Sequence, residues 1–364
     1  MLFSINDPST RNSSALSTGN VIGESMGIKI ADFGFLTYCL FFNGVKERFA
    51  VYEFRFRIYF DFGSRISFKY KSEIENPASE IKKIGYFVID MSMFIASLNS
   101  GSNGNCYYIG NEHEAVLVDA GISCRETERR MLRLGLNIRK VKAIFVSHEH
   151  SDHINGIPVL AKKYQLPVYI TPPTMLHGRL IIEDHLVFPF VAFQTFSIGE
   201  LHISAFPKLH DASNPHSFII TCRDVKVGVF TDIGVACEHV IHHFSQCHAA
   251  FLEANYDDEM LDKGNYPFHL KRRIRGGHGH LSNKQALELF ITHRSPFMSH
   301  LLLSHLSKNN NDPVLVQELF DGRAGDVTVV VASRYRESEV YYVGGLKKAK
   351  ISIPEFEAGQ TSLF

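Results

Sequence analysis

The sequence predicts an α/β protein, a four-layer αββα sandwich in which two β-sheets pack face to face and helices cover their outer sides. Three observations support this prediction. From Met93 onward, short runs rich in Val, Ile and Phe alternate with helical patterns, and Gly or Pro separates them. Tight turns join successive strands in each half of this region, with helical segments between and after them. The 364 residues, 45% hydrophobic and 21% charged, exclude a fibrous or wholly disordered chain.

The expected strands are short apolar runs of β-branched and aromatic residues bounded by turn residues. They lie at residues 94–98, 106–109, 115–119, 143–147, 168–171, 201–206, 217–221, 225–231, 249–253, 301–303 and 327–332. The glycine-rich loop at 101–105 has the composition of a phosphate-binding loop. Because a strand rather than a helix follows it, we interpret it as a tight hairpin turn.

The expected helices show apolar residues at helical spacing between start and stop signals. They lie at residues 124–134, 157–164, 236–244, 267–275, 283–293 and 313–320. The helix at 267–275 illustrates the signals, since Pro267 can start it and Gly276 and Gly277 can stop it.

The composition changes near residue 92, which predicts three parts: an N-terminal extension at 1–92, a domain at 93–345 and a C-terminal tail at 346–364. Residues 1–90 contain 17 phenylalanines and tyrosines and none of the 19 histidines. No sustained period is found there, so no fold is predicted. The extension is either an accessory arm, or a disordered or upstream segment with the true start at Met91 or Met93. We favour the latter, because aromatic and basic residues without a pattern do not specify a core.

Charge and cysteine usage narrow the functional class. The 38 basic and 38 acidic residues balance, so nucleic-acid affinity would need a local basic patch or a metal site. The six cysteines form no CxxC pair and no secretion signal is present, which predicts a reducing cytoplasm. The most apolar run, at 33–42, is too short for a membrane helix, so no membrane association is expected.

A histidine-rich motif directly follows the strand expected at 143–147. It contains His148, His150, Asp152 and His153. Residues two apart in an extended segment point to the same side, so His148 and His150 can bind one ion, while Asp152 and His153 can reach a second. Imidazole and carboxylate ligands suit Zn, Mn or Fe better than Mg or Ca.

This HxHxDH pattern resembles the metal-binding signature of the metallo-β-lactamase fold. Later residues match the other motifs of that superfamily in order, each at the end of an expected strand. The resemblance implies that Asp119 organises the metal-site loops. It implies one ion on His148, His150 and His210, a second on Asp152, His153 and His305, and Asp232 between them.

Further segments resemble the bacterial YycJ/WalJ (VicX) proteins, which are regarded as DNA exonucleases. The similarity covers about residues 93–345 and is carried by segments starting at Ser100, Leu252, Gly279 and Ser304. The Glu253-Ala pair and the His280-x-Ser pattern also resemble a Glu and His pair that assists phosphodiester cleavage in RNase Z. The resemblance implies a DNA exonuclease with two divalent ions, Zn or Mn.

The expected chemistry is phosphodiester hydrolysis by two neighbouring ions. Such ions lower the pKa of a shared water, so that a bridging hydroxide attacks phosphorus. We expect Asp152, His280 and Glu253 to take part in catalysis, with His280, oriented by Glu253, protonating the leaving oxygen. The alternative for His280 is a residue that only caps the helix at 283–293. A basic run could neutralise substrate phosphates or only cover a solvated helix face; it comprises Lys271, Arg272, Arg273 and Arg275.

Two other functions remain open at the level of sequence. A small-molecule hydrolase acting on a thioester or lactone would use the same metals but not the basic run. A regulatory binding module would keep the fold without catalysis, and is disfavoured because every expected ligand is present. The sequence does not decide between DNA and RNA or between Zn and Mn, nor does it give the polarity of digestion or the oligomeric state.

Overall fold

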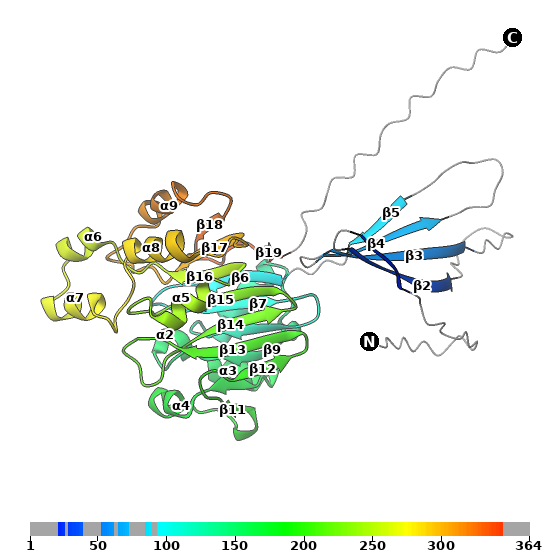
Figure 1. Ribbon diagram of the computed structural model, residues 1–364. Coiled ribbons are helices and arrows are strands. Elements are labelled where there is room, and N and C mark those ends of the chain that lie inside the picture. Colours follow the sequence, from blue (N-terminus) through cyan, green and yellow to red (C-terminus); the bar gives the residue numbers. More distant parts are fainter. Residues whose placement is uncertain are drawn as a thin grey trace, which may run out of the picture. The chain divides into compact units, whose positions relative to one another are not determined.

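The computed structural model describes residues 21–25, 28–38, 52–61, 65–72, 84–88 and 93–344 (Figure 1). The chain divides into two compact units, Met1–Asp90 and Met91–Phe364. The tail expected at 346–364 lies outside the described residues. None of the helices in the described ranges combines the length and apolar character that crossing a bilayer requires.

The first unit contains an antiparallel sheet whose strands pair in chain order. They are β1 Val21–Ser25, β2 Ile28–Tyr38, β3 Tyr52–Asp61, β4 Arg65–Ser72 and β5 Ile84–Val88. The expectation of a patternless segment is wrong here. Along β3 an apolar or aromatic residue occupies every second position from Tyr52 to Phe60, which is the period of a strand.

The second unit contains two seven-stranded sheets. Sheet I has the order β11-β10-β9-β8-β7-β6-β19, and sheet II has the order β12-β13-β14-β15-β16-β17-β18. The strands of sheet I are β6 Met93–Asn99, β7 Cys106–Gly110, β8 Ala115–Val118, β9 Val141–Phe145, β10 Val168–Ile170, β11 Val187–Pro189 and β19 Tyr341–Val343. Those of sheet II are β12 Thr195–Ile198, β13 Leu201–Pro207, β14 His216–Cys222, β15 Val225–Phe230, β16 Ala249–Glu253, β17 His300–Ser304 and β18 Thr328–Val331.

Helices cover the outer side of each sheet, which confirms the predicted sandwich. The α-helices are α1 Cys124–Arg133, α2 Ser151–Ile154, α3 Ile157–Tyr164, α4 Pro172–Gly178, α5 Glu238–Phe244, α6 Asp258–Lys263, α7 Phe268–Arg275, α8 Asn283–His293 and α9 Pro313–Asp321. Two 3₁₀ turns are η1 Ile138–Lys140 and η2 Asp184–Leu186. Helix α1 contacts β6 and α3, whereas α5 contacts β15 and α9 contacts β18.

Three buried clusters hold these layers together. The central cluster lies between the sheets, where the ring of Phe145 from sheet I meets that of Phe218 from sheet II at 5.7 Å between centroids. A second cluster joins sheet I to α1 and α3, and a third joins sheet II to α5, α8 and α9. Burial of both faces explains why most of these strands read as nearly continuous apolar runs.

The expected elements of the second unit are confirmed with small shifts at their ends. Segments 157–164, 249–253 and 283–293 match α3, β16 and α8 residue for residue. Segment 143–147 is displaced, because β9 ends at Phe145 and the chain then extends into the histidine-rich motif. Six short elements of three to seven residues each were not predicted, namely β11, β12, β19, α2, α4 and α6. Such lengths are too short for a period to show.

Candidate metal centre

The predicted site residues gather where strands of both sheets end. In sheet I, Asp119 follows β8 and the histidine-rich motif follows β9; in sheet II, His210 follows β13, Asp232 follows β15, Glu253 ends β16 and His305 follows β17. Strands β8 and β9 are parallel, as are β15, β16 and β17, so within each set the carboxyl ends lie at one edge. The predicted metal ligands therefore come together from both sheets.

Three histidines form the first donor group. The Nε2 atom of His148 lies 3.1 Å from Nδ1 of His150, and Nε2 of His210 lies 3.4 Å from the same atom. The other ring nitrogen of His148 is 2.9 Å from the Ser147 hydroxyl, and that of His210 is 3.0 Å from the carbonyl of Gly279. These contacts fix the rings so that the free nitrogens face one common point.

Asp152, His153 and His305 form the second donor group. A carboxylate oxygen of Asp152 lies 3.3 Å from Nε2 of His305 and 3.6 Å from Nε2 of His153. His153 is fully buried, and its Nδ1 lies 2.7 Å from Asp119. These donor atoms are close enough to hold one ion together.

Asp232 lies between the two groups. One of its carboxylate oxygens is 3.1 Å from Nε2 of His153, and the other is 3.8 Å from Nε2 of His210. The carboxylate is almost fully buried, and its Oδ2 atom has no partner with hydrogen-bond geometry. A buried carboxylate oxygen without such a partner is costly unless a cation compensates it.

The donor set therefore fits divalent metal ions. Three imidazole nitrogens face one another at 3.1 and 3.4 Å, and imidazole nitrogens are ligands that Zn and related ions prefer. Asp232 offers beside them a buried carboxylate oxygen that has no hydrogen-bond partner. The residue types and the short distances between their donor atoms therefore both favour a metal site here.

The buried histidines of the two donor groups differ in protonation state. Burial lowers the pKa of His148 well below its usual value and that of His210 to about 4, so both rings are neutral. Burial also acts to lower the pKa of His153, but the carboxylates of Asp232, Asp119 and Asp152 outweigh it and raise that pKa to about 10. His305 is likewise buried, and the surrounding carboxylates raise its pKa well above the usual value.

Asp119 holds the loop that carries the histidine-rich motif. One of its oxygens accepts the backbone N–H of Ser147, and the other accepts the Ser147 hydroxyl, both at 2.8 Å. The second oxygen also meets His153 at 2.7 Å. This arrangement agrees with the organising role that the family resemblance implies for Asp119.

Two site residues escaped the sequence analysis, Ser147 and Asn105. The amide of Asn105 lies 3.0 Å from Nε2 of His153 and 3.2 Å from the Asp152 carboxylate. It belongs to the glycine-rich loop between β6 and β7, which is the predicted hairpin turn and also reaches the site. A serine and an asparagine in loops carry no motif of their own, so only the fold reveals them.

Glu253 connects His280 to His305. Its Oε1 atom lies 2.8 Å from Nδ1 of His280 and 2.9 Å from Nδ1 of His305. Its Oε2 atom accepts the backbone N–H of Ile233 and that of Leu281. Although burial opposes ionisation, His280 in particular lowers the pKa of Glu253 to about 2. The carboxylate therefore orients two histidines at once, beyond the single contact the sequence analysis expected.

The basic run lies on α7, beside a cavity of about 210 Å³ that His280 and His305 also line. Arg273 lines this cavity and forms an ion pair with Asp211. Arg275 pairs with Asp262 at 2.6 Å, and Lys271 donates to the Asp262 carbonyl. Within the basic run, Arg273 therefore faces the cavity, as a contact to substrate would require. Arg275 and Lys271 instead contact protein groups on α6.

Comparison with known proteins identifies the family. A family model described as a beta-lactamase superfamily domain matches residues 114–305. The exodeoxyribonuclease YycJ of Bacillus anthracis is 36% identical over 226 residues, 61% of this chain and 85% of that protein. The exodeoxyribonuclease WalJ of Streptococcus pneumoniae serotype 2 is 32% identical over 219 residues, 59% of this chain and 81% of that protein.

A solved structure supports the same fold. The metallo-β-lactamase fold protein YhfI from Bacillus subtilis superposes with a TM-score of 0.54 at 16% identity, covering 69% of this chain and 99% of that one. The fold implies divalent metal cofactors, and the two donor groups described above offer ligands for them. The chain therefore belongs to the metallo-β-lactamase superfamily and, within it, to the YycJ/WalJ family, and it is a metal-dependent hydrolase.

Proposed function

We propose that the domain at residues 93–345 is a dinuclear-metal phosphodiesterase, most specifically a DNA exonuclease, that acts in the cytoplasm. The observation that carries the proposal is the meeting of two three-residue donor groups at Asp232. The names of the YycJ and WalJ relatives support DNA as the substrate. The five described cysteines are free thiols, which supports a reducing compartment.

The first ion would be held by His148, His150 and His210, and the second by Asp152, His153 and His305. Asp232 would be shared by both ions. When bound, two divalent ions, Zn or Mn, activate a water molecule and neutralise charge on the phosphate. Ser147, Asp119 and Glu253 keep the ligand rings in place through the hydrogen bonds already described.

We assign His280 the role of moving a proton to the leaving oxygen. Its Nδ1 contacts Glu253, which leaves Nε2 as the nitrogen available to substrate. The side chain is 19% exposed and lines the small cavity together with His305. The capping box of α8 supports this role over that of a simple helix cap, because the Ser282 hydroxyl already accepts the N–H of Gln285 there.

Arg273 is the member of the basic run best placed for substrate, because it lines the same cavity. Its partner Asp211 is 26% exposed, so a phosphate can compete for the guanidinium. We assign Lys271, Arg272 and Arg275 a weaker, longer-range attraction for the nucleic-acid backbone.

Digestion of end-labelled nucleic acids tests this function. The full chain is incubated with duplex DNA, single-stranded DNA and RNA in the presence of Mn or Zn, and with a chelator. The matched variants are His150→Ala and His185→Ala; the second removes an exposed histidine that contacts Gln165 instead of the centre. We expect stepwise shortening of DNA that stops with chelator and in His150→Ala only. A metal-loaded protein that cleaves none of the three substrates contradicts the proposal and favours the thioester or lactone hydrolase.

A further inference from the structure

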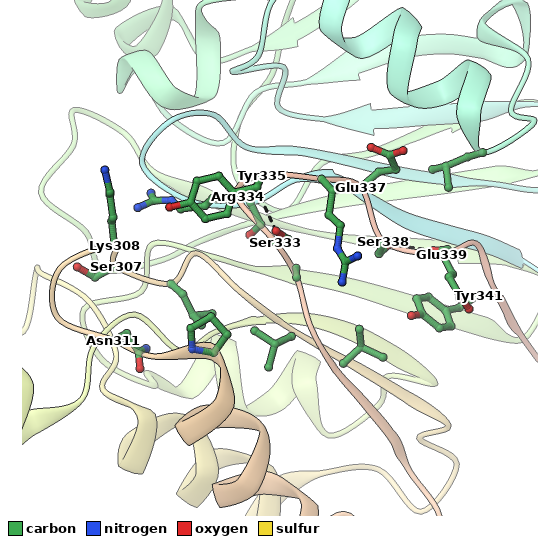
Figure 2. Close-up of a pocket in the computed structure, with 18 residues that line it drawn as sticks. Ser307, Lys308, Asn311, Ser333, Arg334, Tyr335, Glu337, Ser338, Glu339 and Tyr341 are labelled. Atoms are coloured by element: carbon green, nitrogen blue, oxygen red, sulfur yellow. Dashed lines mark hydrogen bonds between the residues drawn. The ribbon is translucent and has the colours of Figure 1, made fainter.

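A second and larger cavity, about 680 Å³ in volume, is lined in part by Leu306 and Ser307, the two residues that follow His305 (Figure 2). Its walls come from the loop after β17 and from the segment 332–340, which crosses from β18 in sheet II to β19 in sheet I. The lining includes Lys308, Arg334, Tyr335 and Arg336. None of these residues belongs to the donor groups or to the basic run, so the proposed chemistry leaves them unused.

The two cavities share part of their lining, in the chain that follows His305. Leu306 and Ser307 line both of them. Ser102 lines the smaller cavity, and its hydroxyl accepts a hydrogen bond of 2.8 Å from the Arg334 guanidinium, which lines the larger one. A polymer whose bond is cleaved beside His305 can therefore extend over Ser307 toward Arg334.

The crossing segment has a fixed backbone. The carbonyl of Ser333 accepts the N–H of Ser100, and the carbonyl of Arg334 accepts the Asn103 amide at 2.8 Å. The Tyr335 carbonyl accepts from Arg130 at 3.2 Å, and Ser338 exchanges two hydrogen bonds with the backbone of Ser97. A backbone that is already anchored loses little further conformational entropy when its side chains bind a ligand.

An exposed aromatic ring and two cations lie on this segment, and a third cation lies in the loop after β17. Tyr335 is 73% exposed, although its backbone is anchored on either side. Lys308, Arg334 and Arg336 supply positive charge, while the neighbouring acid Glu337 is neutralised by Arg133 through two contacts of 2.6 Å. Figure 2 shows Lys308, Arg334 and Tyr335 toward one end of the cavity and Glu339 toward the other.

We propose that this cavity binds the single strand of nucleic acid that extends from the cleaved bond, a placement that rests on the proposed nuclease function. Tyr335 stacks on a base, and Lys308, Arg334 and Arg336 contact the phosphates. An aromatic platform beside cations suits a single strand of any sequence, because every base has a stacking face. Because such binding does not depend on the identity of the base, digestion can continue through different sequences.

The test compares a dinucleotide with a single-stranded 12-mer as substrates of the full chain. Only the 12-mer is long enough to occupy the larger cavity, so the ratio of the two KM values reports that cavity. In Tyr335→Ala we expect the KM for the 12-mer to rise roughly 5- to 150-fold relative to that for the dinucleotide, which is the range that loss of one stacking contact produces. Tyr335→Phe keeps the ring face and is expected to restore the ratio.

Charge is tested by salt dependence. Removal of one phosphate contact by Lys308→Ala or Arg336→Ala is expected to reduce the slope of log affinity against log salt by about 0.7 for the 12-mer. The matched control is Arg139→Ala, in η1 before β9 and thus at the opposite end of that strand from the histidine-rich motif. Unchanged KM ratios and slopes in an enzyme that degrades the 12-mer overturn the inference alone. A wild-type protein that degrades neither substrate overturns the proposed function instead.

Discussion

Three residues of the centre share an uncommon backbone conformation. Asp119, Asp232 and His305 have φ values of 60°, 54° and 56°, in the left-handed region that non-glycine residues rarely adopt. Each stands directly or nearly directly after a strand, at the point where the chain must turn toward the site. Such strain persists only where the surrounding structure imposes it, and it commonly marks functional residues.

At this scale the sequence predicted which metal-ligand side chains would lie together, but not the residues and backbone conformations that hold them. The seven predicted ligand residues could be recognised because each is of a type that binds metal and each follows an expected strand, and the structure brings them together. The positive φ values could not be predicted, since aspartate and histidine adopt them only under tertiary constraint. The double contact of Glu253 likewise depends on how β16 and β17 pair.

Separate substitutions can distinguish the roles of His280 and Glu253. In His280→Gln we expect kcat to fall 10²- to 10⁴-fold, the usual contribution of a general acid, with the metal content unchanged. In Glu253→Gln we expect a loss of both kcat and metal, because the same carboxylate holds His305. Metal analysis of the purified variants, alongside kcat, provides the measurement. Equal metal loss in both variants would contradict this division of roles.

Metal binding should release protons. Without metal, His153 has a pKa of about 10 and His305 a pKa well above its usual value, so both rings are protonated at pH 7. A metal ligand needs a free nitrogen lone pair, so binding displaces protons and the apparent affinity rises as the pH increases toward 10. Calorimetric titration at pH 7 in two buffers with different ionisation enthalpies measures this release. Identical heats in both buffers would show that no proton leaves.

At the scale of elements, the strands and helices of the second unit were predictable because burial leaves a strong hydrophobic pattern. The sequence did not reveal how closely the loops between these strands and helices approach one another. A Cβ atom on Gly121, in the loop after β8, would lie 1.7 Å from the carbonyl oxygen of Asp152. The glycine thus permits direct backbone contact between the Asp119 loop and the metal-binding loop.

The substitution Gly121→Ala should therefore displace Asp152 from the centre. We expect a loss of about 1–3 kcal/mol in the free energy of unfolding, together with weaker metal binding. Gly322→Ala serves as the control, because a Cβ there meets no atom within 4 Å. Chemical denaturation and metal titration of the two variants test the expectation. A Gly121→Ala protein that binds metal like Gly322→Ala would contradict it.

At the scale of the whole molecule, the second unit contains both seven-stranded sheets and all predicted site residues. The strands of the first unit pair only with one another among the described strands. We therefore expect a chain that begins at Met91 to fold and to hydrolyse nucleic acid like the full chain. Thermal unfolding and digestion by the two chains provide the comparison. A truncated protein that folds but loses activity would instead support the accessory-arm interpretation of residues 1–92.

The division of the metal ligands between sheets I and II has a consequence for folding. His148, His150, Asp152 and His153 come from one side of the central core, and His210, Asp232 and His305 from the other. Bound ions would thus cross-link the two halves of the sandwich. Because the ions bind only the folded chain, their binding free energy would add to the free energy of folding. The amount of intact enzyme in a cell would then follow the supply of metal, because chains that lack it open more readily to proteases.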